Sequence, residues 1–149
     1  TRSLIVTGVQ TCALPISKGL VMNNTYGAIV FGHGSRDPLW YVPMQQVVED
    51  FKKLNPDWHV SLAFLEMNPL SLELATQNLA SLGVTHLRIT PMFFGVGKHV
   101  REDLPLLVDE LRKQHPHITI DLLPAVGEHP EFSMWVAQLI SRSHTPIHS

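Results

Sequence analysis

The sequence predicts an α/β fold: a three-layer αβα sandwich around a four-stranded parallel sheet, in the flavodoxin-like order 2-1-3-4. Two observations favour it. From Tyr26 onward, short β-rich apolar runs alternate with longer amphipathic runs, which is typical of βα units. Short connections and right-handed crossovers then favour an open sheet with helices on both faces.

Four runs have the composition of buried strands. The first and the third are apolar enough to be buried on both faces. The predicted strands are residues 27–31, 59–66, 86–93 and 118–123. In the predicted order the first three strands are neighbours, so their carboxyl ends meet at one crevice, where ligands bind in open sheets of this kind.

Helix-length segments separate the strands and carry end signals. The first helix is predicted to begin near Pro38, with apolar residues at spacings of three and four, and to end at Asn55. The second is predicted to have Asn68 as its N-cap and Pro69 at its first helical position, and to close at Gly83.

The third helix is predicted to start near Glu102 or Asp103, because Pro105 is tolerated only in a first turn. It is expected to end at His115, which precedes a proline. The fourth helix is predicted to start around Pro130 and to lead into a polar tail.

Length and composition indicate one domain. The chain has 149 residues, 44% of them hydrophobic, which suits a single core. A formal charge of −2 excludes the strongly basic surface of a general nucleic-acid binder. We see no apolar run of the roughly 18 residues that a membrane span requires. Since the one cysteine, Cys12, allows no internal disulfide, we expect a reducing compartment, the cytoplasm by default.

The amino-terminal segment has a different character. Residues 1–21 are predicted to be a non-native or disordered extension, since residues 6–17 resemble a translated sequencing-library adapter. A secretory signal is the alternative, but its apolar run is shorter than such signals use. Met22 then serves as the expected native start. Residues 22–142 form the predicted single domain, and residues 143–149 a frayed tail.

Two histidines and a carboxylate follow three of the predicted strands. His33 and His99 come after the first and third strands, and Glu66 ends the second. Imidazole and carboxylate ligands suit Co, Ni, Fe and Zn without selecting among them. Three ligands with no obvious fourth describe an open metal site. The glycines beside both histidines allow sharp turns and the close approach of a flat ligand.

Three motifs together resemble one family. They are residues 31–37, residues 64–69 and residues 91–105, and the resemblance extends from Tyr26 to about Ile140. The chain resembles the small class II chelatases, the sirohydrochlorin chelatases of the CbiX type. The resemblance implies a lyase that inserts divalent Co, Ni or Fe, as a substrate, into sirohydrochlorin or a related tetrapyrrole, with no other cofactor. It also implies a homodimer that encloses the large ligand.

The resemblance further implies roles for single residues. His33 and His99 match the two metal-binding histidines of the family, and Glu66 matches a carboxylate at the rim of the active site. Either Glu66 or a histidine not then on the metal is expected to accept the two pyrrole protons. Nearby cations are expected to bind the carboxylates of the tetrapyrrole; these are Arg36, Lys98 and Arg101.

Plainer interpretations stay open beside these. Glu66 could cap a helix, Lys98 and Arg101 could be solvated, and Arg36 could pair with Asp37. A non-catalytic metal or tetrapyrrole carrier on the same fold would use the same histidines, and only turnover separates it from an enzyme. A histidine phosphatase is disfavoured because it needs an arginine immediately before the first histidine.

Overall fold

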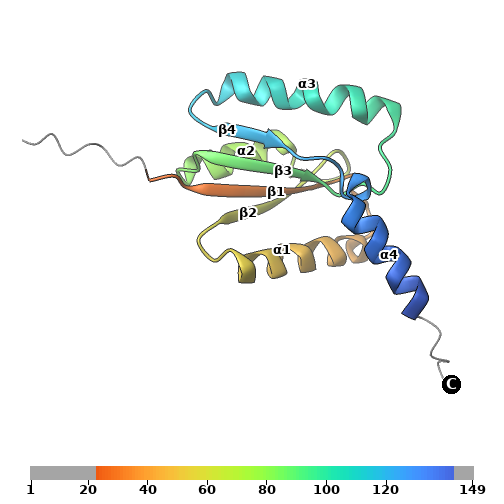
Figure 1. Cartoon of the computed structure of the whole chain (residues 1–149). Helices are drawn as coiled ribbons and strands as arrows, with labels where there is room; N and C mark the ends of the chain where they lie inside the picture. Colours follow the sequence, from red (N-terminus) through yellow and green to blue (C-terminus); the bar gives the residue numbers. More distant parts are fainter. Residues whose placement is uncertain (1–22, 143–149) are drawn as a thin grey trace, which may run out of the picture.

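The computed structural model describes residues 23–142 and contains the predicted sheet. Its four parallel strands lie in the order β2-β1-β3-β4. Figure 1 shows them side by side, with all carboxyl ends at one edge. Their bounds are β1 Tyr26–Gly32, β2 His59–Phe64, β3 His86–Pro91 and β4 Thr119–Leu122. The predictions for residues 1–21 and 143–149, Cys12 included, fall outside the described residues.

Strands β2 and β3 end two residues earlier than predicted. After Phe64 the chain turns back, and Phe64 N–H donates to the carbonyl of Leu70 at 2.9 Å. Strand β3 stops at Pro91, which has no N–H to continue a ladder. Glu66, Phe93 and the residues around them therefore lie in loops beyond the sheet.

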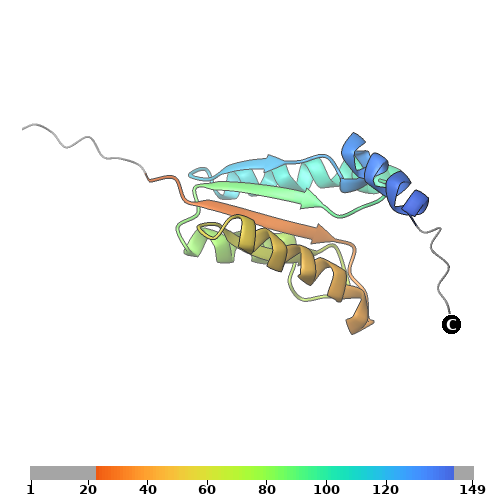
Figure 2. The same cartoon turned by 60° about the horizontal axis from the view of Figure 1, so that its bottom comes forward.

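Helices cover both faces of the sheet, as predicted. Helix α1 (Val42–Leu54), preceded by the 3-10 turn η1 (Pro38–Tyr41), packs Met44 and Val48 on one face. Helices α2 (Leu72–Ser81) and α3 (Lys98–Gln114) pack on the other face and form the larger core. Figure 2 shows the sheet between these helix layers.

The start of α2 differs from the prediction. Ser71 is the N-cap, and its hydroxyl accepts from Leu74 N–H at 3.2 Å. The Asn68 side chain instead accepts from Leu70 N–H at 2.9 Å, which closes a local turn. The expectation of Asn68 as a cap and Pro69 at the first helical position is therefore wrong, because the asparagine stabilises a loop ahead of the helix. Gly83 does follow the helix, with a positive φ of 83°.

The start of α3 also differs. The helix begins at Lys98, four residues before the predicted Glu102, with Gly97 as an extended N-cap. Pro105 consequently stands inside the helix, where it offers no N–H to the carbonyl of Arg101. His99 and Arg101, expected in a loop, belong to the first turn of α3. The predicted end at His115 is confirmed.

Helix α4 (Pro130–Arg142) starts at Pro130 as predicted and follows the short turn η2 (Val126–Glu128). Both views place it past the carboxyl ends of the strands. None of its residues is buried. Within residues 23–142, no helix combines the length and apolar character needed to cross a membrane.

Candidate metal and ligand site

Two loops are joined at the carboxyl edge of the sheet. Pairing of β1 with β2 ends at Gly32 opposite Phe64, but backbone hydrogen bonds continue past it. Leu65 N–H donates to Gly32 O at 2.9 Å, and Glu66 N–H donates to His33 O at 3.0 Å. The two loops therefore run together beyond the strands and bring His33 and Glu66 to neighbouring positions.

The side chains of this pair face each other. His33 Nδ1 lies 3.8 Å from Glu66 Oε1, and the two side chains are 55% and 54% exposed. The prediction that strands 1 and 2 deliver an imidazole and a carboxylate to one place is confirmed. An imidazole and a carboxylate, both open to solvent, can hold a divalent ion while leaving coordination positions free.

Gly34 permits this close approach. Its φ is +99°, and an added Cβ would stand 1.9 Å from the carbonyl oxygen of Glu66. Only glycine suits both conditions. Met67, directly after Glu66, has a φ of 57°, so the second loop also turns through the left-handed region. The glycines near His99 differ: Gly95 and Gly97 have no atom within 4 Å of a built Cβ, and no positive φ is recorded for them.

Aromatic packing fixes the first loop. The His33 ring lies 5.5 Å from the ring of Phe93, which is buried in the loop after β3. Tyr41 donates its hydroxyl proton to Ser35 O, and Asp37 caps the turn η1 by accepting from Leu39 N–H at 2.9 Å. Asp37 thus has a capping role in place of the suggested ion pair with Arg36.

His99 does not join His33 and Glu66 in one group of ligands. It lines a cavity of about 190 Å³ at the start of α3, together with Leu65, Asp103 and other residues. Among residues 23–142, no group of three His, Cys, Asp or Glu side chains is placed to hold one metal ion. The expected convergence of all three ligands is therefore not met. His99 is in the first turn of α3, where the helix backbone fixes its position, and not in a loop as predicted.

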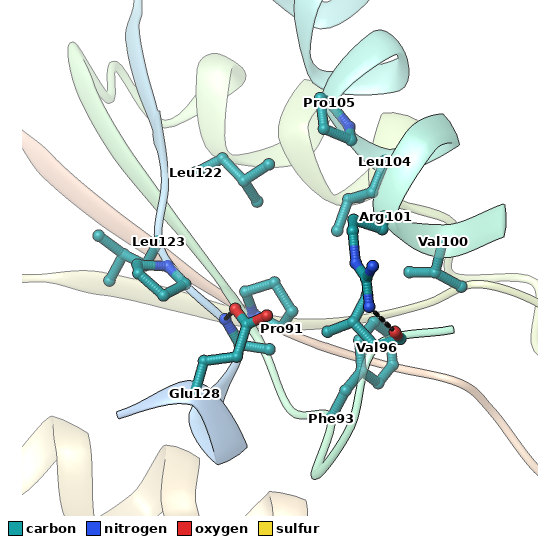
Figure 3. A pocket seen from close by; sticks show the side chains of 12 residues that line it. Pro91, Phe93, Val96, Val100, Arg101, Leu104, Pro105, Leu122, Leu123 and Glu128 are labelled. Atoms are coloured by element: carbon teal, nitrogen blue, oxygen red, sulfur yellow. Dashed lines mark hydrogen bonds between the residues drawn. The ribbon is translucent and has the colours of Figure 1, made fainter. Parts of the chain in front are cut away.

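The predicted cations occupy different surroundings. Arg101 lines a larger cavity of about 300 Å³ between α3 and the ends of β3 and β4, and its Nη2 donates to Val96 O at 2.8 Å. Figure 3 shows Arg101 and Glu128 on opposite sides of this cavity. Lys98 lies 4.0 Å from Glu102, fully at the surface, and Arg36 is exposed in the loop after β1.

Sequence reasoning missed both cavities and the apolar surroundings of the pair. Large apolar side chains in the loops after β1, β2 and β3 are exposed, and we call them the apolar rim. They are Leu39 (75% exposed), Leu65 (43%), Met67 (56%) and Phe94 (76%). The available signal in the sequence was that Leu65 and Met67 flank Glu66, and that Leu39 and Phe94 stand in the segments that carry or precede His33 and His99. A solvated metal ion alone has no need of such surroundings.

Comparisons with known proteins identify the family of the chain. The profile of the CbiX family matches residues 27–143. A sirohydrochlorin cobaltochelatase from Methanosarcina acetivorans is 31% identical over 91 residues, which are 60% of this chain and 70% of that protein. Another, from Methanococcoides burtonii, is 29% identical over 67% of this chain and 77% of that protein.

Solved structures share the fold. A putative cobalamin biosynthesis CbiX protein from Marinobacter aquaeolei superposes with a TM-score of 0.68 and 23% identity, over 78% of this chain and 95% of that one. The sirohydrochlorin chelatase SirB from Bacillus subtilis, in complex with cobalt, has a TM-score of 0.67 and 20% identity. There the match covers 80% of this chain but 51% of SirB. With the family profile spanning most of the domain, from β1 through α4, the chain belongs to the CbiX family.

Proposed function

We propose that this protein is a metallochelatase that inserts a divalent metal into sirohydrochlorin or a related tetrapyrrole. The observation that carries the proposal is the exposed His33–Glu66 pair, 3.8 Å apart, within the apolar rim. The relatives named sirohydrochlorin cobaltochelatases support the substrate and favour cobalt as the metal. Nickel and ferrous iron suit the same ligands and remain part of the proposal.

The proposed reaction exchanges one metal ion for two protons. His33 and Glu66 hold the hydrated ion, with His99 approaching from the first turn of α3. The ring nitrogens replace the protein ligands on the metal, and each of two pyrrole N–H groups releases a proton. Glu66, once the metal has left it, or a histidine freed from the metal accepts these two protons in turn and passes them to water. The enzyme needs no cofactor beyond its metal substrate in this scheme.

The carboxylates of the tetrapyrrole require cationic partners. Arg101 is the best placed of the predicted three, because Val96 O holds its guanidinium beside the 300 Å³ cavity. Lys98 and Arg36 extend the positive charge toward solvent. A carboxylate bound by Arg101 would be oriented by charge-assisted hydrogen bonds.

A homodimer is part of the proposal. The described cavities of about 300 and 190 Å³ are too small to enclose a whole tetrapyrrole with its side arms. This chain matches 51% of SirB, so the rest of the SirB chain is long enough for a second domain of this size. We infer that a second copy supplies the corresponding wall here. A cytoplasmic location stays a prediction.

Anaerobic absorbance spectroscopy tests the activity. The purified chain is mixed with sirohydrochlorin and, separately, Co²⁺, Ni²⁺ or Fe²⁺, against the same mixtures without protein. A spectral shift faster than in the control, with many product molecules per protein, is expected. Tight binding without acceleration would identify a carrier instead, and neither binding nor turnover would contradict both functions. Sedimentation equilibrium on the same sample tests the homodimer.

A further inference from the structure

The motif at residues 91–105 contains a carboxylate, Asp103, that the proposed reaction does not use. Asp103 is the fourth residue after His99 on helix α3, and both side chains line the cavity of about 190 Å³. Among the described residues that line this cavity, only these two have polar side chains; the others are Leu65, Val100, Leu104 and Leu107. The cavity therefore brings one imidazole and one carboxylate together in otherwise apolar surroundings.

Helix geometry directs the Asp103 side chain toward His99. Side chains four residues apart lie on one face of a helix, with their Cβ atoms about 5–6 Å apart. Each side chain also leans toward the amino terminus of its helix. Asp103 therefore leans over the preceding turn, which carries His99. Helix α3 begins at the carboxyl edge of the sheet (Figure 1), so Asp103 lies behind His99 as seen from that edge.

The same cavity touches the loop that carries Glu66. Leu65, directly before Glu66, forms part of the cavity wall, and its N–H donates to Gly32 O at 2.9 Å. His99 and the Glu66 loop thus border one space. Because an imidazole binds a metal through one ring nitrogen only, the orientation of the His99 ring decides whether that nitrogen can reach an ion bound at Glu66.

Neither member of the cavity pair is committed to another partner. Within residues 23–142, the side chains of His99 and Asp103 form no hydrogen bond or ion pair, with each other or with any other residue. Glu102, the other carboxylate next to His99 on the helix, lies 4.0 Å from Lys98 instead and does not line the cavity. Both members of the pair are exposed, so rotation of their side chains is enough to join them.

We propose that Asp103 is a positioning residue for His99. Its carboxylate accepts a hydrogen bond from one ring nitrogen of His99, and the lone pair of the other ring nitrogen is then directed at the metal during transfer. A carboxylate that holds a metal-binding histidine in this way selects one tautomer and one ring orientation. The inference rests on the proposed function and deepens it, because Asp103 touches neither metal nor tetrapyrrole and acts only through His99.

Steady-state metallation of sirohydrochlorin with Co²⁺ tests this role. Asp103→Asn keeps the size of the side chain but removes its charge, and kcat is expected to fall roughly 10- to 100-fold, as after loss of such a carboxylate elsewhere. KM for both substrates and the Co²⁺ affinity without the ring should stay unchanged. Asp103→Glu keeps the carboxylate and should keep most of the turnover. Glu102→Gln is the matched control, because it removes the same charge one residue away, and its kcat should equal that of the wild type.

Two further measurements distinguish positioning from a structural role. In a His99→Ala background, Asp103→Asn should change kcat by less than about twofold, since no imidazole is left to orient. Nitrogen-15 NMR of the metal-free protein reports which ring nitrogen of His99 carries the proton. We expect one tautomer in the wild type and in Glu102→Gln, and a mixture of both in Asp103→Asn.

Four results would overturn the inference alone. They are wild-type kcat in Asp103→Asn, an equal loss in Glu102→Gln, the full loss on adding Asp103→Asn to His99→Ala, and a weaker Co²⁺ affinity of Asp103→Asn without the ring. The last would make Asp103 a metal ligand. A wild-type protein without turnover would contradict the proposed function instead, whereas an unchanged His99 tautomer in Asp103→Asn would contradict this inference whatever the turnover.

Discussion

Gly34 offers the sharpest test of how the His33–Glu66 pair is assembled. An alanine there meets two separate penalties. Its φ of +99° is unfavourable for any residue with a Cβ, and that Cβ would lie 1.9 Å from Glu66 O. The first penalty is about 1–2 kcal/mol. To relieve the second, the loops must separate, which lengthens the bonds from Leu65 N–H and Glu66 N–H at about 1 kcal/mol each.

The expected destabilisation of Gly34→Ala is therefore about 3–4 kcal/mol. For a domain of this size, that lowers the melting temperature by roughly 8–15 °C. Because the same separation moves His33 away from Glu66, the Co²⁺ affinity should fall at least tenfold, by the order of magnitude lost when ligand support is removed. Thermal unfolding by circular dichroism and calorimetric titration with Co²⁺ measure the two effects.

Alanine substitutions at two further glycines separate the cost of backbone strain from the cost of the steric clash. Gly83 has a φ of +83° but nothing within 4 Å of a built Cβ, so Gly83→Ala should cost about 1 kcal/mol from backbone strain alone. Gly95 has open space and no recorded positive φ, and Gly95→Ala should leave stability within about 0.5 kcal/mol of the wild type. Equal losses in Gly34→Ala and Gly83→Ala, or unchanged Co²⁺ affinity in the former, would refute the joined-loop reasoning.

Further predictions concern the ligands and α3. His33→Ala should lower Co²⁺ affinity at least tenfold without tetrapyrrole, since His33 belongs to the close pair. His99→Ala should lower turnover more than Co²⁺ affinity because it lines a separate cavity; calorimetry and steady-state rates that show the reverse order would contradict this. Glu66→Gln keeps the shape but removes the charge, and should weaken Co²⁺ binding about tenfold by calorimetry, with no fall in melting temperature. Pro105→Ala restores an N–H to the carbonyl of Arg101 and should raise the melting temperature by several degrees in calorimetric scans; a decrease would show that the proline is needed where it stands.

The sequence predicted the sheet well because its strands carry strong local signals. The run around Ile29 has no polar interruption and is buried on both faces. The run around Ile89 alternates instead, with Arg88 exposed, so the prediction that the third strand is buried on both faces is wrong. The right-handed crossover rule nevertheless leaves few possible strand orders. Local signals were less decisive at helix starts. Asn68 followed by Pro69 is typical of a helix start, but the Asn68 side chain stabilises a turn ahead of α2. Pro105 predicted a helix that begins just before it, although the proline lies inside α3. In both cases long-range packing decides where the helix begins.

The candidate site was predictable in its residue types and only partly in its geometry. Glu66 and His33 follow adjacent strands, so a parallel register alone brings them near each other. The place of His99 depends on where α3 starts, which no residue near it signals. Helix α4 was predictable as a helix, but its position depends on the contact of Gly127 with Phe94, between segments far apart in the chain. Amphipathic spacing predicts which side of a helix is apolar, but it does not predict which element packs against that side.

The solvent exposure of the His33–Glu66 pair suits a metal ion that is passed on to a tetrapyrrole, as the proposed function requires. A closed structural site uses four protein ligands and holds its ion as part of the fold. Here the two candidate ligands are each more than half exposed, so an ion bound to them would keep most of its coordination positions for water. Water is readily replaced by ring nitrogens, so a weakly held ion can pass to a tetrapyrrole, whereas an ion in a complete protein site could not. A third ligand, His99, carried on a separate helix outside the pair, would add metal affinity only when a bound tetrapyrrole draws the two elements together. The separation of His99 from the pair is therefore compatible with a transfer site, and it would be a defect in a storage site.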